Sequence, residues 1–219
     1  MSGRVSDPRL LESGMCVTTP IGPLELLELL GRGKSGYSWK ARTALGELVV
    51  YKAMHDEPCS FYRFSGNKVE HERGAWLVLS RAGIPLPDPL CFDPEGNSLV
   101  KEYIAGDTGC LLAADDRVDL ELVRALRRMS LMAKAEGLNL DWFPPNFVRR
   151  GTELVYIDYE ANPWDARWSL EHWGFWYWAN AAGMRHLREQ HSMSDLEDEP
   201  GHPRHQGLES RVRAWCTES

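Results

Sequence analysis

The sequence has no run of eighteen apolar residues, so it offers no segment long enough to cross a membrane as a helix. Its first residues, MSGRVSDPRLLES, are polar and lack the apolar core of a signal peptide. Positive charge is in the minority, because 25 Lys and Arg stand against 32 Asp and Glu and give a net charge of −7. This balance argues against broad binding to nucleic acid or to an anionic membrane surface.

Patterns that bind metals or form disulfides are also missing. The five cysteines are scattered, form no C-x-x-C pair and are odd in number, which favours reduced thiols and a cytoplasmic location. The seven histidines show no H-E-x-x-H spacing, and the chain has no internal repeats. With 219 residues and 43% apolar side chains, the chain can form one large domain or two small lobes.

Glycine is concentrated in one stretch, LLGRGKSGYSWKA, at residues 29–41. A Walker A loop would need a glycine five residues before Gly33, where the chain has Glu28, and a helix directly after Lys-Ser. The residues that follow, YSW, favour extended chain instead. The other phosphate-binding pattern is G-x-G-x-x-G, formed by Gly31, Gly33 and Gly36 between two strands. For the loop on its own, an ordinary glycine-rich hairpin is the alternative.

The first half of the chain reads mainly as strands. Residues 1 to about 20 are expected as a loose lead-in. Alternating and β-branched residues predict strands at about 24–30, 36–42, 47–53, 90–92 and 98–103, with one helix at 68–83. These elements predict a mainly antiparallel sheet over about 24–103.

The second half reads mainly as helix. Leu122, Leu126, Met129 and Ala133 form an apolar face that predicts a helix over 119–137. The stretches NFVRR and ELVYID predict two short strands around a turn at Gly151. A tryptophan-rich helix is expected at about 166–190, followed by a polar linker and a short helix at about 207–216.

Charged and amide side chains follow the glycine loop in a definite order. Lys52 ends a strand, and either Glu70 or Glu72 of the next helix is its expected partner, with Glu72 preferred. The stretch LVKEYIAG, around Glu102 and Tyr103, has the character of a strand that leads into a hinge.

Three further polar residues lie in the second half. Asp141 and Asn146 form a D-x-x-x-x-N spacing in DWFPPN, and Asp158 ends an apolar strand in VYIDYE. Each also has a simpler interpretation, because Asp and Asn are common turn residues beside proline.

This order resembles the protein-kinase-like superfamily over about residues 24–160, and it is most similar to the compact atypical branch. That branch includes RIO-type kinases, aminoglycoside and choline phosphotransferases, and small bacterial kinase-like proteins. The resemblance implies an α+β, two-lobed kinase-like fold, with a mainly antiparallel N-lobe sheet and a short helical C-lobe. The implied parts are an N-lobe at 1–103, a reduced C-lobe at 104–190 and a polar tail at 191–219.

The resemblance also implies ATP and Mg²⁺ as ligands. The backbone of Gly31, Gly33 and Gly36 would cover the phosphates, and Lys52, held by Glu72, would pair with phosphate oxygens. Backbone groups near Glu102 and Tyr103 would contact the adenine.

The same resemblance assigns the chemistry. Asn146 and Asp158 would bind Mg²⁺ through oxygen atoms. Asp141 would accept or orient the proton of the acceptor hydroxyl.

The pattern departs from the family in several places. The first position of H-x-D holds Asn139, the D-F-G position reads Asp158-Tyr159-Glu160, and no A-P-E follows. Only residues 159–219 remain after Asp158, which is short for the helices that bind peptides in typical protein kinases.

A short lower lobe implies an open site beside Asp141, which favours a protein serine or threonine hydroxyl as acceptor. Autophosphorylation is expected on the chain's own tail, which carries Ser192, Ser194 and Ser210. Two alternatives are a small-molecule phosphotransferase of the aminoglycoside or choline type, and a pseudokinase that binds nucleotide without transferring phosphate.

Overall fold

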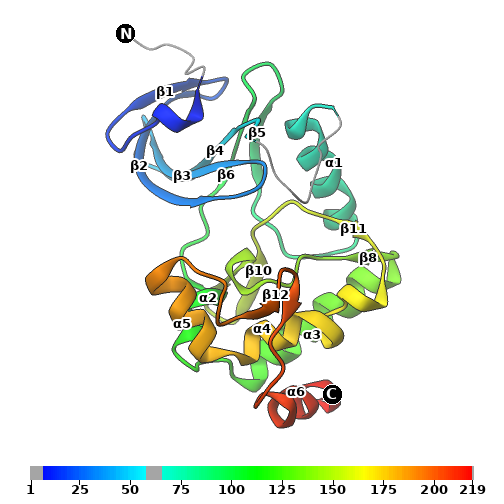
Figure 1. Ribbon diagram of the computed structural model, residues 1–219. Coiled ribbons are helices and arrows are strands. Elements are labelled where there is room, and N and C mark those ends of the chain that lie inside the picture. Colours follow the sequence, from blue (N-terminus) through cyan, green and yellow to red (C-terminus); the bar gives the residue numbers. More distant parts are fainter. Residues whose placement is uncertain (1–6, 58–65, 219) are drawn as a thin grey trace. The chain divides into compact units, whose positions relative to one another are not determined.

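The computed structural model describes residues 7–57 and 66–218. The chain divides into two compact units (Figure 1). Unit 1 is made of Met1–Gly74 and Pro87–Tyr103, and unit 2 of Ala75–Leu86 and Ile104–Ser219. The chain passes from unit 1 to unit 2 within helix α1, Lys68–Arg81.

Unit 1 is built on a curled, antiparallel sheet of six strands in the order β1-β2-β3-β4-β6-β5 (Figure 1). Its strands are β1 Cys16–Thr19, β2 Gly22–Arg32, β3 Gly36–Thr43, β4 Leu48–Met54, β5 Pro89–Asp93 and β6 Ser98–Glu102. The α+β class and the antiparallel sheet are therefore confirmed, and the expected strands are present with ends that differ by a few residues.

The core of unit 1 forms on one face of this sheet. Alternate residues of β2 and β3 point to that face, among them Leu24, Leu26, Trp39 and Ala41, and all four are buried. The central strand β4 is buried at every position after its first residue. A polar residue in β4 is therefore removed from water and needs a partner in the fold.

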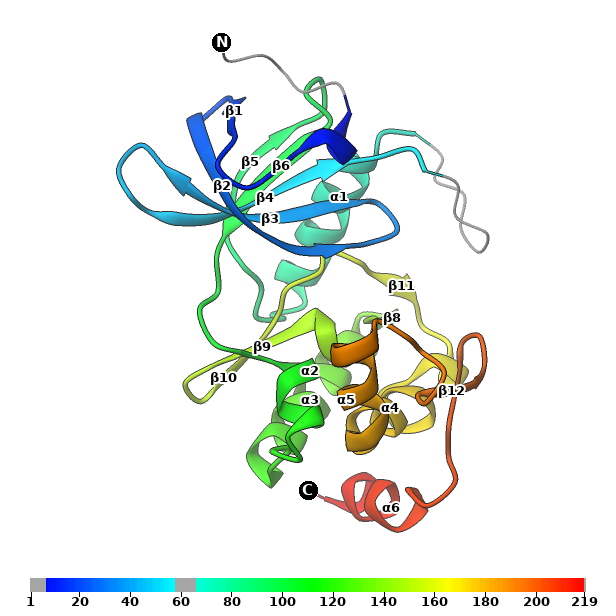
Figure 2. The ribbon, with the colours of Figure 1, turned by 60° about the vertical axis from the view of Figure 1, so that its left-hand side comes forward.

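Unit 2 combines helices with three small antiparallel sheets (Figure 2). Its helices are α2 Gly109–Ala114, α3 Leu120–Ala135, α4 Phe175–Ala179, α5 Ala181–Gln190 and α6 Glu209–Thr217. Its strands are β7 Asp107–Thr108, β8 Leu138–Asn139, β9 Phe147–Arg150, β10 Glu153–Tyr156, β11 Asn162–Pro163, β12 Glu197–Glu199 and β13 His202–Pro203.

The core of unit 2 lies around α3. Its predicted apolar face is confirmed, because Leu122, Leu126, Met129 and Ala133 are each at most 3% exposed. The aromatic side chains Trp142, Phe147, Phe175 and Trp178 belong to the same cluster and are fully buried. The residues around Asp141 are thereby attached to the densest part of the unit.

The single helix expected at 166–190 is wrong. A 3-10 turn at Ala166–Trp168 and a π-helical turn at Leu170–Gly174 come first, and α4 and α5 follow. Asn180 separates the two helices because its backbone leaves the helical region, with ψ 75°. Its side chain accepts a hydrogen bond from the amide of Gly183 at 2.8 Å and so begins a new helix.

The lead-in also contains structure that the sequence did not indicate. Strand β1 pairs with β2 through a tight hairpin, in which Thr19 lies opposite Gly22. The hydroxyl of Thr19 donates to the carbonyl of Gly22 at 2.7 Å, and Gly22 adopts a φ of 111°, which favours glycine.

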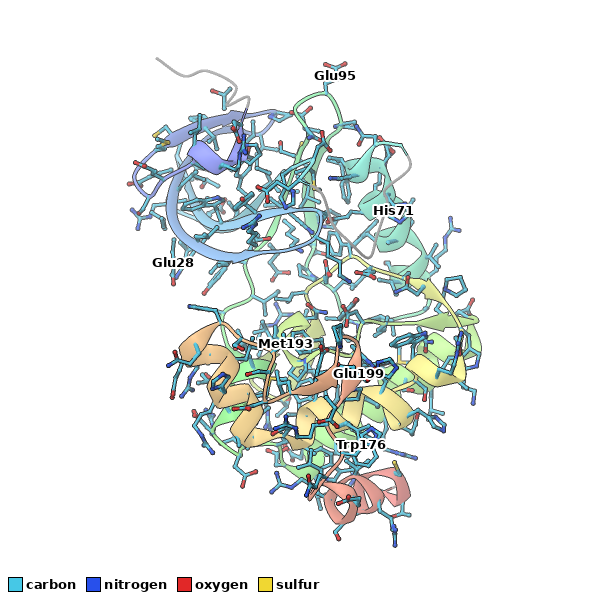
Figure 3. The ribbon with its side chains drawn as sticks, viewed as in Figure 1. Glu28, His71, Glu95, Trp176, Met193 and Glu199 are labelled. Carbon is cyan, nitrogen blue, oxygen red and sulfur yellow. The ribbon has the colours of Figure 1, made fainter. Side chains whose placement is uncertain are left out.

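The C-terminal segment packs onto unit 2. Leu196, Val212 and Trp215 are buried, and the hydroxyl of Tyr177 donates to the Glu197 carboxylate at 2.6 Å. Figure 3 labels Met193 and Glu199, which precede and follow Glu197 in the sequence. The residues expected as a polar tail thus form the strands β12 and β13 and the helix α6 within unit 2.

Candidate functional site

The glycine-rich loop joins β2 to β3, so it lies between antiparallel strands and opens no helix. The amide of Gly33 donates to the carbonyl of Gly36 at 2.9 Å and closes the turn. A Cβ atom built on Gly36 would lie 2.6 Å from the carbonyl oxygen of Ala53, so the close approach of β4 requires glycine there.

The other two glycines are not required by packing. Among the described residues, a Cβ atom on Gly31 would meet no atom within 4 Å, and one on Gly33 only the carbonyl of Gly36 at 3.8 Å. Neither residue has a positive φ in the range that favours glycine. The backbone at Gly31 and Gly33 is therefore accessible to a ligand of the kind that the resemblance implies.

Lys52 lies in β4 and forms an ion pair with Glu72 of α1. Its Nζ atom is 2.5 Å from Oε1 of Glu72, and the two side chains are only 8% and 7% exposed. Glu70 is exposed and pairs with Arg73 instead, at 3.7 Å. His71, between the two glutamates in α1, is exposed (labelled in Figure 3). Of the two candidate glutamates, Glu72 is the one that contacts the lysine.

Ser35 links the glycine loop to this ion pair. Its hydroxyl donates to Oε1 of Glu72 at 3.0 Å, and this is the same oxygen that contacts Lys52. The second oxygen, Oε2, is buried and has no hydrogen-bond partner within residues 7–57 and 66–218. Sequence reasoning located the loop but missed Ser35, because the contact depends on how closely the loop approaches α1.

The end of β6 holds the two residues expected near an adenine. The amide of Glu102 donates to the carbonyl of Asp88 at 2.8 Å, so this donor is already used within unit 1. The ring of Tyr103 lies under the ammonium group of Lys40, which is 4.8 Å from the ring centre.

Asp141 lies in a loop between β8 and a 3-10 turn at Pro144–Asn146. Its Oδ1 atom accepts a hydrogen bond from the amide of Phe143 at 3.2 Å. Its carbonyl accepts one from the side-chain amide of Asn146 at 3.3 Å. This contact orients the Asn146 side chain, because Nδ2 is used as the donor and Oδ1 is left as the metal-binding type of atom.

The loop around Asp141 is held by the aromatic core. The carbonyl of Trp142 accepts a hydrogen bond from the indole nitrogen of Trp178 at 2.9 Å. The rings of Trp142 and Phe147 are stacked, with centres 6.0 Å apart and planes 9° apart. Gly109 also approaches closely, since a Cβ atom there would lie 2.3 Å from the Pro144 carbonyl. The loop therefore has little freedom to move.

Strand pairing places Asn146 beside Asp158. Phe147 of β9 lies opposite Tyr156 of β10, so the residue before β9 and the residues after β10 are neighbours. The amide of Ile157 donates to the carbonyl of Asn146 at 2.8 Å. Asp158, the next residue, accepts a hydrogen bond from the amide of Tyr159 at 3.0 Å.

Tyr156 connects these segments, and sequence reasoning missed it. Its buried hydroxyl accepts a hydrogen bond from the amide of Asp141 at 3.3 Å and donates to the carbonyl of Glu160 at 3.1 Å. Burial raises the pKa of this phenol well above its usual value, and the nearby carboxylates of Asp158, Asp141 and Glu160 raise it further. The phenol therefore stays protonated and can keep donating. Its hydrogen-bond partners are backbone groups of Asp141 and Glu160, and contacts with the backbone leave no residue pattern in the sequence.

Each unit thus assembles its own set of the predicted residues. Unit 1 holds the three glycines, Lys52, Glu72, Glu102 and Tyr103, and unit 2 holds Asp141, Asn146 and Asp158. No group of three or more His, Cys, Asp or Glu side chains placed to hold a metal occurs in the part of the chain that the structure describes. The predicted metal ligands are one amide and one carboxylate, so a bound ion would need further oxygens from water or phosphate.

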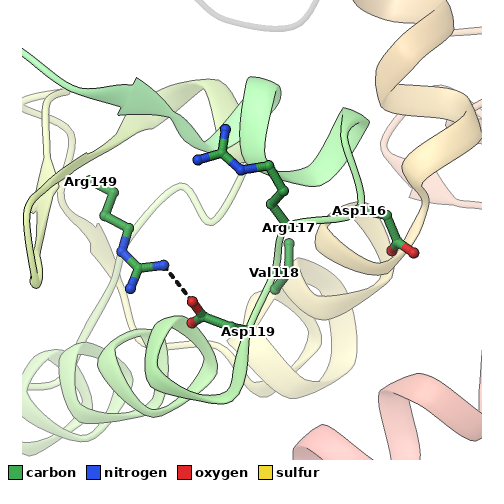
Figure 4. Close-up of a pocket in the computed structure, with 5 residues that line it drawn as sticks. All are labelled: Asp116, Arg117, Val118, Asp119 and Arg149. Carbon is green, nitrogen blue, oxygen red and sulfur yellow. Dashed lines mark hydrogen bonds and ion pairs between the residues drawn. The ribbon is translucent and has the colours of Figure 1, made fainter.

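Two surface hollows of unit 2 lie outside the predicted set. One, of about 350 Å³, is lined by Asp116, Arg117, Val118, Asp119 and Arg149 (Figure 4). The other, of about 310 Å³, is lined by Glu121, Arg124, Arg128 and Thr152. Arg149 pairs with Asp119 at 2.6 Å and with Glu121 at 3.2 Å, so acidic and basic side chains alternate across this surface.

No protein-family model and no curated protein sequence matches this chain. Among residues 7–57 and 66–218, no helix combines the length and the apolar character needed to cross a membrane.

Proposed function

We propose that this chain is an ATP- and Mg²⁺-dependent phosphotransferase of the atypical kinase type, and that it transfers the γ-phosphate to a serine or threonine hydroxyl of a protein. The buried ion pair of Lys52 and Glu72, joined to the glycine loop through Ser35, is the observation that carries the proposal. The resemblance over residues 24–160 supplies the reaction type, and the geometry within each unit is compatible with it.

The ion pair calls for an explanation other than stability. Removing two charges from water is costly, and a buried pair is often no more stable than well-packed apolar residues. Lys52 and Glu72 are nevertheless both more than nine-tenths buried. A lysine held in this way beside a glycine loop is suited to pair with phosphate oxygens, because its ammonium group is a compact charge in a fixed place.

The adenine is proposed to lie at the end of β6. Because the Glu102 amide is bonded to Asp88, a contact from Glu102 to the base would use its carbonyl oxygen. The aromatic ring of Tyr103 adds apolar surface next to that position, beside Lys40.

Asn146 and Asp158 are proposed to hold Mg²⁺, which would neutralise phosphate charge when bound. The hydrogen bond from Nδ2 of Asn146 to the Asp141 carbonyl leaves Oδ1 as the ligand atom. Strand pairing makes the backbone of Asn146 a neighbour of the segment that carries Asp158, which supports the proposal. An oxygen-only donor set matches the preference of Mg²⁺.

Asp141 is proposed to accept the proton of the acceptor hydroxyl. Its carboxylate is oriented by the amide of Phe143, and its backbone is held by Tyr156 and Asn146. A fixed carboxylate is what proton transfer requires, because general-base catalysis depends on distance before it depends on pKa.

A separate protein is proposed as the main acceptor. Ser192 and Ser194 hydrogen-bond to each other at 3.1 Å in the segment that packs onto unit 2. The carbonyl of Asp195, next in the chain, accepts a hydrogen bond from Asn180 at 2.8 Å. These hydrogen bonds hold the segment that carries the two serines within the fold of unit 2, and Ser210 is exposed on α6.

Nucleotide binding is the first test. We would titrate the wild-type protein with ATP, with and without Mg²⁺, and compare Asp158→Ala with Asp141→Asn. Loss of a metal ligand should weaken Mg²⁺-ATP binding by about tenfold or more, since contacts to charged groups contribute about 1.5–3 kcal/mol. Asp141→Asn should change it by less than about threefold, because Asp141 faces the acceptor hydroxyl. Equal effects, or no binding by the wild type, would contradict the proposal.

Phosphate transfer is the second test. We would incubate the protein with labelled ATP and Mg²⁺, alone and with cell extract, and use Asp141→Asn as the control. Label on a protein that is lost in Asp141→Asn supports the proposal. Binding without transfer would favour the pseudokinase, and transfer only to an aminoglycoside or choline would favour the small-molecule enzyme.

A further inference from the structure

A hydroxyl, an imidazole and a carboxylate meet beside α5 in unit 2. His186 lies in α5, and Ser194 and Asp195 lie in the segment that leads from α5 to β12, next to Met193, which Figure 3 labels. The Nε2 atom of His186 is 3.3 Å from the hydroxyl oxygen of Ser194. Its Nδ1 atom is 3.4 Å from Oδ2 of Asp195. The three side chains thus stand in the order of a nucleophile, a base and a group that orients the base.

The chain turns back at the end of α5 and brings these residues together. His191 has a φ of 53°, the left-handed conformation in which many helices end. Leu196 is then buried in the same cluster as Met184 of α5. A Cβ atom on Gly183 would lie 2.6 Å from the carbonyl of Asp195, so the segment approaches the helix closely. The contacts with α5 therefore come from a packed segment.

Arg204 and Asn180 fix the segment further. Nη2 of Arg204 donates to the carbonyl of Ser194 at 3.0 Å, and its Nη1 lies 3.7 Å from Oδ1 of Asp195. The side chain of Asn180 donates to the carbonyl of Asp195 at 2.8 Å. One carboxylate oxygen of Asp195 thus faces Arg204 and the other faces His186, and the two contacts orient the carboxylate.

These contacts determine the direction of the hydrogen bonds when the imidazole is neutral. An ionised carboxylate can only accept, so the ring proton is favoured on Nδ1, next to Asp195. Nε2 is then an acceptor, and the hydroxyl of Ser194 donates to it. The hydroxyl of Ser192 donates to the oxygen of Ser194 at 3.1 Å. Ser194 is therefore placed to lose its proton to His186, with a donor beside the oxygen that gains charge.

The cluster is accessible to solvent. Ser194 is exposed, and the side chains of His186 and Asp195 are 33% and 49% exposed. An ion pair with this exposure contributes little to stability. A small molecule can reach the hydroxyl, but an exposed site holds a substrate weakly. An ester with a good leaving group is therefore the class of substrate that fits.

We propose that Ser194 is a nucleophile that cleaves activated carboxylic esters, with His186 as its general base and Asp195 as a positioning residue. The Ser194 oxygen forms a bond to the acyl carbon while its proton moves to Nε2 of His186. The departing alcohol or phenol takes that proton. Water then attacks the acyl group, gives a proton to His186 and releases a carboxylic acid, and the proton returns to Ser194.

The positive charge of Arg204 lies beside the backbone of Ser194 and favours the negative charge that develops on the substrate oxygen. This activity is separate from phosphate transfer and goes beyond the proposed function, since it uses none of the residues assigned to it.

Reaction of the full chain with p-nitrophenyl acetate tests the nucleophile and the base. We would follow the release of p-nitrophenol and locate the acetyl group by peptide mass spectrometry. His186→Gln should slow acetylation of Ser194 by about a hundredfold or more, the contribution of a general base. His191→Asn is the matched control, because it removes an exposed histidine at the end of α5 and asparagine tolerates the left-handed conformation there. We expect it to react as the wild type does.

Ser210 provides an internal reference, because it is an exposed serine on α6. Its acetylation reports the reactivity of an ordinary serine in the same sample. Ser194 should be acetylated faster than Ser210 by about a hundredfold, the same contribution of the base.

Asp195→Asn tests the positioning residue. It should slow acetylation of Ser194 by roughly tenfold, a modest effect because the pair with His186 is half-exposed. Nitrogen NMR should also show the ring proton of His186 shifting away from Nδ1. Asp198→Asn removes a carboxylate that lies 3.1 Å from Arg204, and should change neither the rate nor the ring proton. Thermal unfolding would confirm that each variant is folded.

Acetylation of Ser194 that depends on His186 supports the proposal. A folded wild-type chain that is not acetylated at Ser194, or equal acetylation of Ser194 and Ser210, would overturn it. Acetylation of Ser194 that His186→Gln leaves unchanged would overturn it as well. If Asp195→Asn changes neither the rate nor the ring proton, the role of Asp195 is overturned.

Discussion

The hydroxyl of Tyr156 accepts a hydrogen bond from the backbone amide of Asp141 at 3.3 Å. Through its donated bond to Glu160, the same hydroxyl joins the loop before β9 to the segment after β10. The proposed proton acceptor and the segment of the proposed metal ligand Asp158 are therefore positioned by one phenol.

Tyr156→Phe should reveal this link. Phenylalanine keeps the packing of the ring but leaves the Asp141 amide and the Glu160 carbonyl without their partner, at a cost of about 1–3 kcal/mol in the free energy of unfolding. We expect the rate of phosphate transfer to fall as well, because Asp141 loses its orientation. Thermal or urea unfolding and a transfer assay would measure the two effects.

Tyr177→Phe is the matched control for Tyr156. Its hydroxyl is also buried and bonded, but to Glu197 in the C-terminal segment. We expect a similar loss of stability without a change in the transfer rate. If both variants slow transfer equally, the slower rate reflects a general loss of stability, and Tyr156 does not act through Asp141.

Glu72→Gln should both destabilise the fold and weaken nucleotide binding. The variant removes the charge of Glu72 from its buried pair with Lys52, and breaking a buried pair typically costs about 3–5 kcal/mol in the free energy of unfolding. Glu70→Gln makes the same change of charge two residues earlier in α1, at an exposed position, and should change the free energy of unfolding by less than about 0.5 kcal/mol. Urea unfolding measures both variants, and comparable effects would show that the pair contributes little.

The three glycines should respond differently to alanine. Gly36→Ala places a Cβ atom against the Ala53 carbonyl and should destabilise unit 1 by about 1–3 kcal/mol. Gly31→Ala should leave stability nearly unchanged, since a Cβ atom there meets no described atom within 4 Å. We expect it to weaken ATP binding instead. A stable Gly36→Ala protein, or a Gly31→Ala protein with normal ATP affinity, would contradict this division.

Acidification should remove a stabilising contact at Asp119, the residue that begins α3. Partial burial raises its pKa, but hydrogen bonds from Arg149 and from the amide of Leu122 outweigh this, so the net pKa is lowered. A carboxylate with a lowered pKa stabilises the fold above its unfolded value, about 3.9, and loses this effect as the pH falls through its folded value.

The charge and the cap of Asp119 can be separated. Asp119→Asn keeps a good helix cap but loses the charge that pairs with Arg149 (Figure 4). Because this ion pair is partly exposed, the variant should lower the free energy of unfolding by less than about 1 kcal/mol at neutral pH. The difference from wild type should vanish in acid. Asp119→Ala should lower the free energy of unfolding by about 0.5–1 kcal/mol more, because the side chain that caps α3 by accepting from the Leu122 amide is lost as well. Unfolding curves between pH 2 and pH 7 would measure this.

Much of the fold followed from periodicity. The strands β2, β3 and β4 and the helix α3 lie close to the positions predicted, because their alternating or helical apolar patterns describe one buried face each. The break at Asn180 was missed, since an apolar run gives no sign that one side chain will cap a new helix. The hairpin of β1 was hidden in a stretch that two prolines made look irregular.

The sequence predicted only part of the candidate site. The residues that carry charge, Lys52 and Glu72, were found because their types and order follow a known arrangement. Ser35 and Tyr156 were not, because each acts on a backbone group or a side chain far from it in the sequence. Such contacts depend on the packed fold and leave no spacing to recognise. The short helix expected at about 207–216 is present as α6. The stretch before it was misjudged as a linker, since a few apolar residues, Leu196 among them, attach it to unit 2.

The segment Ala75–Leu86 is synthesised long before the rest of the unit to which it belongs. It leaves the ribosome between the two parts of unit 1, yet Leu79 and Ile84 are buried in the core of unit 2. These two side chains must stay in water until α3 and Trp142 have been made, and a nascent chain in that state is prone to aggregate. A fragment that stops at residue 103 would expose Leu79 and Ile84 permanently, because it lacks the core of unit 2 that buries them. We therefore expect such a fragment of unit 1 to aggregate when it is expressed.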